Sequence, residues 1–139
     1  MYFNEMMKQA KPGFIIYLDD DDKLTCPQAI SEIVENIDHE NQMLFWRVQF
    51  PGYVVPDDKH FGKEPVCCQI STAGFAFHTN YLKFAWWDEY SLGDFRTAIS
   101  LYNRIPEKVY IPKILTGVQE STGGLGERND LKTNITNDI

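Results

Sequence analysis

Apolar residues recur three or four positions apart in several segments of the chain, which is the spacing of an amphipathic helix. These segments predict helices at residues 2–10, 27–37, 80–85 and 93–103. In the second of them, Ile30, Ile33 and Ile37 share one face, and Pro27 stands near the first turn, where its missing N–H costs little. Each of these helices has one apolar face to bury against another layer.

Other segments are continuously apolar, or alternate between apolar and polar residues, which is typical of strands. We expect strands at residues 14–18, 43–50, 70–77 and 109–118, the last kinked at Pro112. Helical and strand patterns follow one another along the chain, and this order predicts an α/β fold in which helices flank a mixed sheet. Residues 1–119 fit one such domain. Residues 120–139, rich in Gly, Asn, Thr and charge, predict a flexible C-terminal tail.

The strand at residues 14–18 is apolar on both faces, as shown by its sequence Phe14, Ile15, Ile16, Tyr17 and Leu18. Such a strand belongs in the middle of a sheet that is covered on both sides. No strand is predicted before it, so one edge and some apolar surface are left to be covered. We therefore expect a homo-oligomer, or a complementing chain, docked along this strand and the preceding helix.

Four aspartates, Asp19 to Asp22, follow that strand directly. Four neighbouring carboxylates are difficult to ionise together without a cation. If the extended backbone continues, Asp19 and Asp21 point one way and Asp20 and Asp22 the other. Oxygen ligands at the carboxyl end of a strand suit Mg²⁺ or Mn²⁺ that also holds a diphosphate. The alternative is a solvated acidic loop or a helix N-terminus, where Asp is also favoured.

Composition and charge exclude several classes of function. The formal net charge of −7 argues against binding to nucleic acid or to anionic membranes, both of which need clustered Lys and Arg. No apolar run approaches the roughly 20 residues that span a bilayer, so we expect no transmembrane segment. The 3 cysteines are odd in number and two of them are adjacent, which favours a reducing, cytoplasmic location over a disulfide framework.

Two segments together resemble a known family. Leu18 and Asp19–Asp22, followed by Pro27, are similar to the Leu-Asp-x-Asp-Asp motif that ends a strand in GT-A fold glycosyltransferases, especially those of family 2. Downstream, residues 86–96, with the sequence Trp-Trp-Asp-Glu-Tyr-Ser-Leu-Gly-Asp-Phe-Arg, resemble the acidic segment that opens the helix of the catalytic base in that family. The resemblance covers roughly residues 8–119 and implies a partial GT-A domain, the second half only.

The resemblance implies transfer of a sugar from a nucleotide-diphosphate sugar to a carbohydrate or other hydroxyl acceptor, with inversion and with Mn²⁺ or Mg²⁺. It implies that Asp19 faces the sugar nucleotide, that Asp21 binds the metal and that Asp22 assists. Asp20 exchanges roles with them if the register is shifted by one residue. Asp94 would be the catalytic base, and its alternative role is that of a helix N-cap.

Further residues were assigned to the binding of donor or acceptor by the same resemblance. Asp88 and Glu89 are alternative bases that flank the acceptor. Gly74 would let the donor sugar approach the backbone, or would mark a strand bulge. His78 would bind a phosphate or the acceptor, or have only a structural role. Trp87, with its neighbour Trp86, would stack on a sugar or pack in the core.

The region that resembles the family does not include the part of the family domain that binds the nucleoside. The second functional hypothesis is therefore a non-catalytic carbohydrate- or protein-binding module derived from a truncated transferase. The aspartate run and Asp94 favour the enzyme, and the missing nucleoside-binding part favours the binding module.

Overall fold

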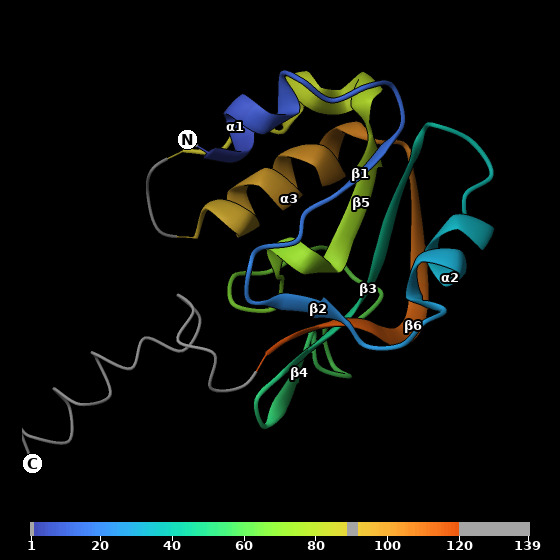
Figure 1. Cartoon of the computed structure of the whole chain (residues 1–139), viewed down its shortest axis with the longest axis vertical. Coiled ribbons are helices and arrows are strands. Elements are labelled where there is room, and N and C mark those ends of the chain that lie inside the picture. The colour runs from blue at the N-terminus through green and yellow to red at the C-terminus, as the bar shows by residue number, and fades with distance from the viewer. Residues whose placement is uncertain (1, 89–91, 120–139) are drawn as a thin grey trace, which may run out of the picture.

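The computed structural model of the protein describes residues 2–88 and 92–119 (Figure 1). Helices lie on both sides of a six-stranded mixed sheet, so the α/β class expected from the sequence is confirmed. The strands are β1 (Phe14–Ile16), β2 (Asp22–Leu24), β3 (Gln42–Phe50), β4 (Tyr53–Val55), β5 (Phe75–His78) and β6 (Glu107–Val118). The helices are α1 (Tyr2–Met7), α2 (Ala29–Glu35) and α3 (Gly93–Arg104), with 3₁₀ turns η1 (Thr72–Gly74) and η2 (Thr79–Phe84).

The strand order in the sheet is β1-β5-β3-β6-β2, and β4 pairs with β3 as a hairpin. Strand β5 is antiparallel to both of its neighbours, β1 and β3, whereas β3 and β6 are parallel. The register between β3 and β6 shifts between the pairs Phe45–Tyr110 and Arg47–Ile114. Pro112 lies inside this irregular stretch, because it has no N–H to give to a regular ladder. The kink predicted at Pro112 is thus a register shift within a continuous strand.

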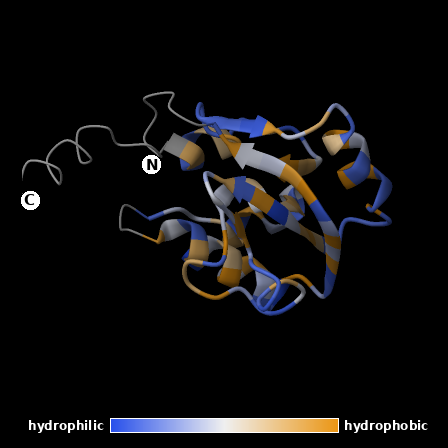
Figure 2. Ribbon diagram, turned by 90° about the horizontal axis from the view of Figure 1, so that it is seen from below, coloured by the Kyte–Doolittle hydropathy of each residue, from blue (hydrophilic) through white to orange (hydrophobic). Residues whose placement is uncertain are grey.

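Each face of the sheet has its own apolar core. On one face, α1, α3 and η2 cover a cluster that includes Phe45, Phe75 and Leu101. On the other face, α2 packs Ala29 and Ile33 against residues of β3, β5 and β6. Figure 2 shows hydrophobic and hydrophilic residues interspersed along the strands and helices, as expected for elements that each bury one face. The result is a three-layer arrangement of helix, sheet and helix.

Two strands were missed because neither has a clear apolar pattern of its own. Strand β2 begins with the charged residues Asp22 and Lys23 and is held by antiparallel pairing with β6. Strand β4 lies between two expected strands, in a segment for which no strand was expected, and pairs with the end of β3. The strand expected at residues 70–77 begins only at Phe75, because the Ser71 side chain accepts a hydrogen bond from the Ala73 N–H and starts η1. Strand β2 and the turn η1 both lie next to the acidic segment of residues 19–22.

The strand expected at residues 14–18 differs most from its prediction. Regular pairing ends at Ile16, and β1 lies at an edge of the sheet with β5 as its partner. The expectation that it occupies the middle of a covered sheet is wrong within the described residues. Its residues are half-buried, Tyr17 beyond it is buried, and Leu18 is 43% exposed.

None of the helices in residues 2–88 and 92–119 is long and apolar enough to cross a membrane. The predicted tail, residues 120–139, and Glu89 lie outside the described residues.

Candidate functional site

A groove of about 310 Å³ lies at the junction of the loop after β1, the end of β6 and the start of α3. It brings together three neighbouring carboxylates, those of Asp19, Asp21 and Asp22, and a fourth from a distant part of the sequence, that of Asp94. The rest of its lining consists of Phe50, Ser71, Thr72 and Val118. The two acidic segments singled out in the sequence therefore face one cavity.

A tight turn gathers the three aspartates that follow β1. The Asp22 N–H donates to the Asp19 carbonyl at 3.0 Å, and the Asp22 Oδ2 accepts from the Asp19 N–H at 2.8 Å. Each of Asp19, Asp21 and Asp22 places one carboxylate oxygen within 4.8 Å of the others. The expected alternation of sides is wrong, because the backbone turns here instead of staying extended. Asp22 joins the group, and Asp20 is exposed and outside it.

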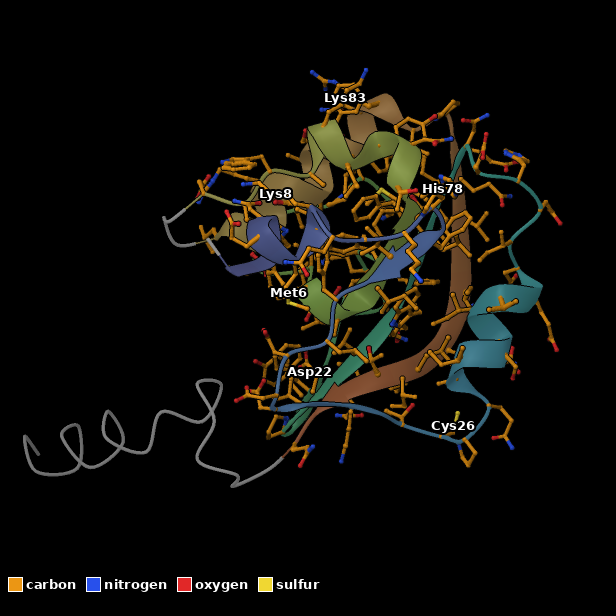
Figure 3. The ribbon with its side chains drawn as sticks, turned by 45° about the horizontal axis from the view of Figure 1, so that its top comes forward. Met6, Lys8, Asp22, Cys26, His78 and Lys83 are labelled. Atoms are coloured by element: carbon orange, nitrogen blue, oxygen red, sulfur yellow. The ribbon has the colours of Figure 1, made fainter. Side chains whose placement is uncertain are left out.

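The turn is fixed to the sheet on its C-terminal side. Asp22 is the first residue of β2 and is paired with Val118 of β6. The Gln119 N–H donates to the Asp21 carbonyl at 2.8 Å. Figure 3 shows Asp22 at the lower end of the sheet, where the chain enters β2. These contacts hold the carboxylates at one position relative to the groove.

Two carboxyl groups of this turn, those of Asp22 and Asp19, have a raised pKa, because part of their hydration is lost. Burial raises the pKa of Asp22 to about 6, with smaller contributions from the other aspartates, while the hydrogen bond from Asp19 acts to lower it. Burial also raises the pKa of Asp19, with Asp21 and Asp20 adding repulsion. A divalent cation bound to these oxygens would remove the repulsion. Three hard oxygen ligands on one turn fit Mg²⁺ or Mn²⁺.

Asp94 lies in the first turn of α3, where its Oδ1 accepts a hydrogen bond from the Phe95 N–H at 2.7 Å. Burial is the main cause that raises the pKa of this carboxyl, and the hydrogen bond from Phe95 opposes it. A partly buried carboxylate with a raised pKa, facing a groove, has the properties of a general base. The helix residue just before it, Gly93, lies next to the Trp87 ring, which a Cβ at this position would meet at 3.5 Å, an ordinary contact distance.

Asp88 is occupied by a different interaction. Its carboxylate accepts from both the Nε and the Nη2 of Arg96, the first at 2.6 Å. It does not line the groove. Asp94 is therefore the downstream carboxylate that faces the aspartate turn, whereas the alternative base Glu89 lies outside the described residues.

Three other residues assigned from the sequence lie away from the groove. Trp87 is buried against Phe3 and Tyr17, so its rings fill the core, and Trp86 is the exposed member of the pair at 64%. Gly74 is buried, and a Cβ there would meet the Val48 side chain at 3.0 Å.

His78 ends β5 at the opposite end of the sheet from Asp22, as Figure 3 shows. Its Nδ1 accepts from the Asn80 N–H at 3.1 Å and caps η2.

Four lining residues were not singled out as site residues by the sequence analysis. Ser71 and Thr72 reach the groove because η1 interrupts the strand expected there, and Phe50 and Val118 reach it because β3 and β6 end beside the aspartate turn. Serine and threonine residues ahead of a strand do not by themselves predict a binding site. They line the groove because the fold places η1 beside the aspartate turn. Trp46 holds this region in place, since its Nε1 donates to the Ala73 carbonyl at 2.9 Å and to the Thr116 hydroxyl at 3.0 Å.

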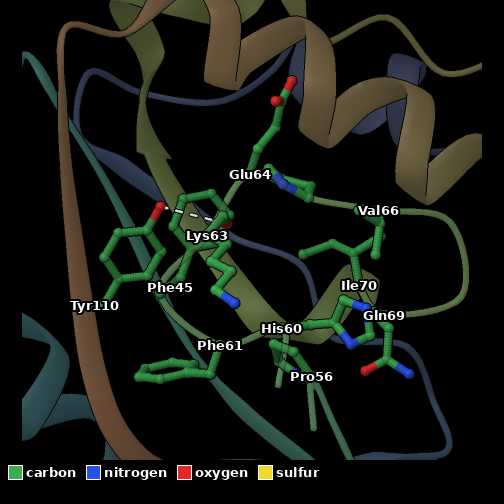
Figure 4. Close-up of a pocket in the computed structure, with 12 residues that line it drawn as sticks. Phe45, Pro56, His60, Phe61, Lys63, Glu64, Val66, Gln69, Ile70 and Tyr110 are labelled. Carbon is green, nitrogen blue, oxygen red and sulfur yellow. Dashed lines mark hydrogen bonds between the residues drawn. The ribbon is translucent and has the colours of Figure 1, made fainter. Parts of the chain in front are cut away.

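A second cavity, shown in Figure 4, is enclosed by the loop of residues 56–70 folded over β3 and β6. It holds only about 20 Å³, roughly the space of one water molecule. In its lining, His60 has its Nδ1 2.6 Å from Asp57 Oδ1, and the Tyr110 hydroxyl donates to the Lys63 carbonyl. The cavity fits a packing defect under the loop and not a substrate site.

No protein-family model matches the sequence, and no curated protein matches it.

Proposed function

We propose that the chain is the catalytic half of a metal-dependent glycosyltransferase that resembles family 2 of the GT-A fold. It would transfer a sugar from a nucleotide-diphosphate sugar to a hydroxyl acceptor, with inversion, in the cytoplasm. The observation that carries the proposal is the groove in which the aspartate turn and Asp94 meet. The mixed α/β sheet is compatible with it.

In this proposal Asp19, Asp21 and Asp22 hold Mn²⁺ or Mg²⁺, with Asp21 as the main ligand. The cation, when bound, supplies positive charge that neutralises the leaving diphosphate. Through that cation the carboxylates would hold the diphosphate at the end of β1, and Ser71 and Thr72, which line the same groove, would offer hydroxyl groups to the sugar.

Asp94 takes the proton of the acceptor. The acceptor oxygen forms a bond to the anomeric carbon while the bond from that carbon to the diphosphate oxygen breaks, and the proton moves to the Asp94 carboxylate. Attack from the side opposite the leaving group inverts the configuration. The raised pKa of Asp94 strengthens it as a base compared with a solvated aspartate.

The groove does not by itself provide a pocket for the nucleoside, since its described lining consists of four carboxylates, two hydroxyls, Phe50 and Val118. We infer that a further polypeptide, either a second copy or a complementing chain, supplies those contacts. Transfer activity would then depend on that assembly.

The test is a transfer assay that follows release of nucleoside diphosphate from a panel of nucleotide sugars with Mn²⁺. Asp94→Asn should lower the rate by about 10²–10⁴-fold while donor binding is retained. Asp88→Asn removes a carboxylate that is bound to Arg96 and does not line the groove, and should change the rate much less. Equal rates for the wild type and Asp94→Asn would exclude Asp94 as the base.

The second candidate is a non-catalytic carbohydrate-binding module. The exposure of Trp86, at 64%, favours it, because exposed aromatic rings stack on sugars. Binding of an oligosaccharide that Trp86→Ala abolishes, with no transfer under any donor, would favour this function over the transferase.

A further inference from the structure

One edge of the sheet, at β1, is open within the described residues. The antiparallel pairing of β1 with β5 matches Ile15 to Phe77, and continues so that the Thr79 N–H donates to the Gly13 carbonyl at 2.9 Å. Hydrogen-bonded pairs alternate along an antiparallel ladder. Ile15 is thus hydrogen-bonded to β5, and the N–H and C=O groups of Phe14 and Ile16 point to the open side.

An apolar groove of about 180 Å³ lies beside this edge, between α1 and β1. Its lining is almost wholly apolar and consists of Phe3, Met6, Met7, Ala10, Ile15, Ile16, Tyr17 and Leu18. Two of these side chains protrude, since Met6 is 52% exposed and Leu18 is 43% exposed. Figure 3 shows Met6 on the outer side of α1, next to β1.

The two ends of the sheet differ in how they are protected. The edge at β2 carries Asp22 and Lys23, and charges of this kind oppose strand addition. The strand β1 has no charge and no proline between residues 14 and 18. An edge strand with unpaired backbone groups, next to an apolar groove, is a surface to which another strand can be added.

Charges at the two ends of β1 match those of a second copy. If two β1 strands pair antiparallel about Ile15, Phe14 lies opposite Ile16 of the other copy and both outward pairs form hydrogen bonds. The ladder stops at Pro12, which has no N–H. Beyond it, the exposed Lys11 of each copy comes opposite the exposed Asp19 of the other. Although each copy has a net charge of −7, the charges that two copies bring together at this edge are opposite in sign and attract.

We propose that the protein forms a two-fold dimer through antiparallel pairing of β1 with β1, so that one sheet continues across both copies. The apolar grooves beside the two strands face each other and exclude water from Met6 and Leu18. This proposal does not depend on the proposed activity, because strand pairing needs neither metal nor nucleotide, although Asp19 has a part in both proposals.

Sedimentation velocity of the purified chain from about 1 to about 100 µM tests the proposal. The wild type should dimerise, and Leu18→Lys should raise the dimer dissociation constant by at least about tenfold. Leu24→Lys is the matched control, since Leu24 is 40% exposed on the opposite edge strand, and it should leave the constant unchanged. A wild type that is monomeric throughout, or equal effects of the two variants, would overturn the proposal.

Cross-linking tests the register. In a chain whose three natural cysteines are changed to Ser, Ile15→Cys places two thiols opposite each other at the two-fold axis, in a pair without hydrogen bonds where Cα atoms approach to about 4.5 Å. Mild oxidation should give a disulfide-linked dimer, and Leu24→Cys should not.

The charge pattern gives an independent check that leaves Ile15 unchanged. Lys11→Asp should weaken the dimer, and adding Asp19→Lys to it should restore the wild-type dissociation constant. Absence of both the cross-link and the restoration would overturn the antiparallel pairing.

Discussion

Asp22→Asn should stabilise the metal-free protein at neutral pH, which is an unusual result for a substitution at a hydrogen-bonded turn. The substitution removes a carboxylate whose pKa is raised to about 6 by burial and by neighbouring aspartates. The amide keeps an oxygen that can accept from the Asp19 N–H, so the turn remains closed. The variant therefore loses the unfavourable charge and retains the local structure.

The magnitude follows from the shift in pKa. The change from 3.8 to about 6 is roughly 2 pH units, an upper limit of about 3 kcal/mol. Asp22 is only half-buried, so solvent screening reduces this to about 1 kcal/mol.

The sign follows from proton linkage. Between the unfolded pKa of 3.8 and the folded pKa of about 6, the folded state keeps a proton that the unfolded state has lost, so stability falls as pH rises through this window. At pH values above this window, the folded protein carries the full free-energy cost of the ionised Asp22 carboxylate.

Urea unfolding in EDTA, followed by tryptophan fluorescence, measures the effect. Asp22→Asn should be more stable than the wild type by about 1 kcal/mol at pH 7, and the two should be nearly equal at pH 4. Asp20→Asn is the control, because Asp20 is exposed and outside the group, and should differ little from the wild type at either pH. A loss of stability at pH 7 in Asp22→Asn would refute the reasoning, because it would mean that the carboxylate is favourable as it stands.

Three further predictions concern the stability of the fold. Trp46→Phe should lower the free energy of unfolding by about 2 kcal/mol, measured in urea, because the Ala73 carbonyl and the Thr116 hydroxyl lose a shared donor. Gly74→Ala should lower it by about 1–3 kcal/mol, since the buried Val48 leaves no room for the new methyl group. Trp86→Ala should change stability by less than about 0.5 kcal/mol, and a larger loss on thermal unfolding would show that the exposed ring is part of the core.

The sequence was a good guide to elements with strong periodicity. α3 and β3 lie within a residue or so of their predicted bounds, because apolar residues at the right spacing specify both the element and its buried face. β2 was missed because Asp22 and Lys23 contain no apolar pattern, and only the pairing with β6 makes this segment a strand. Pairing between strands that are distant along the chain leaves no pattern in the local sequence that would predict the strand.

The site followed the same division. Asp21 and Asp94 were assigned by resemblance, and the structure brings both to one groove. Asp22 was given an assisting role by the same resemblance, but the turn that places its carboxylate beside those of Asp19 and Asp21 was not predicted, because only an extended backbone was considered past Leu18. Trp87 was expected either to stack on a sugar or to pack in the core, and the structure shows it in the core, next to Phe3 and Tyr17.

The central claim is that the aspartate turn binds a divalent cation together with a diphosphate. Isothermal titration of Mn²⁺ into the protein, with and without a nucleoside diphosphate, tests it most directly. The account predicts that the diphosphate tightens Mn²⁺ binding in the wild type and in Asp20→Ala, and that Asp21→Ala removes binding in both conditions while its circular dichroism spectrum is unchanged. Equal titration curves for the wild type and Asp21→Ala would contradict it.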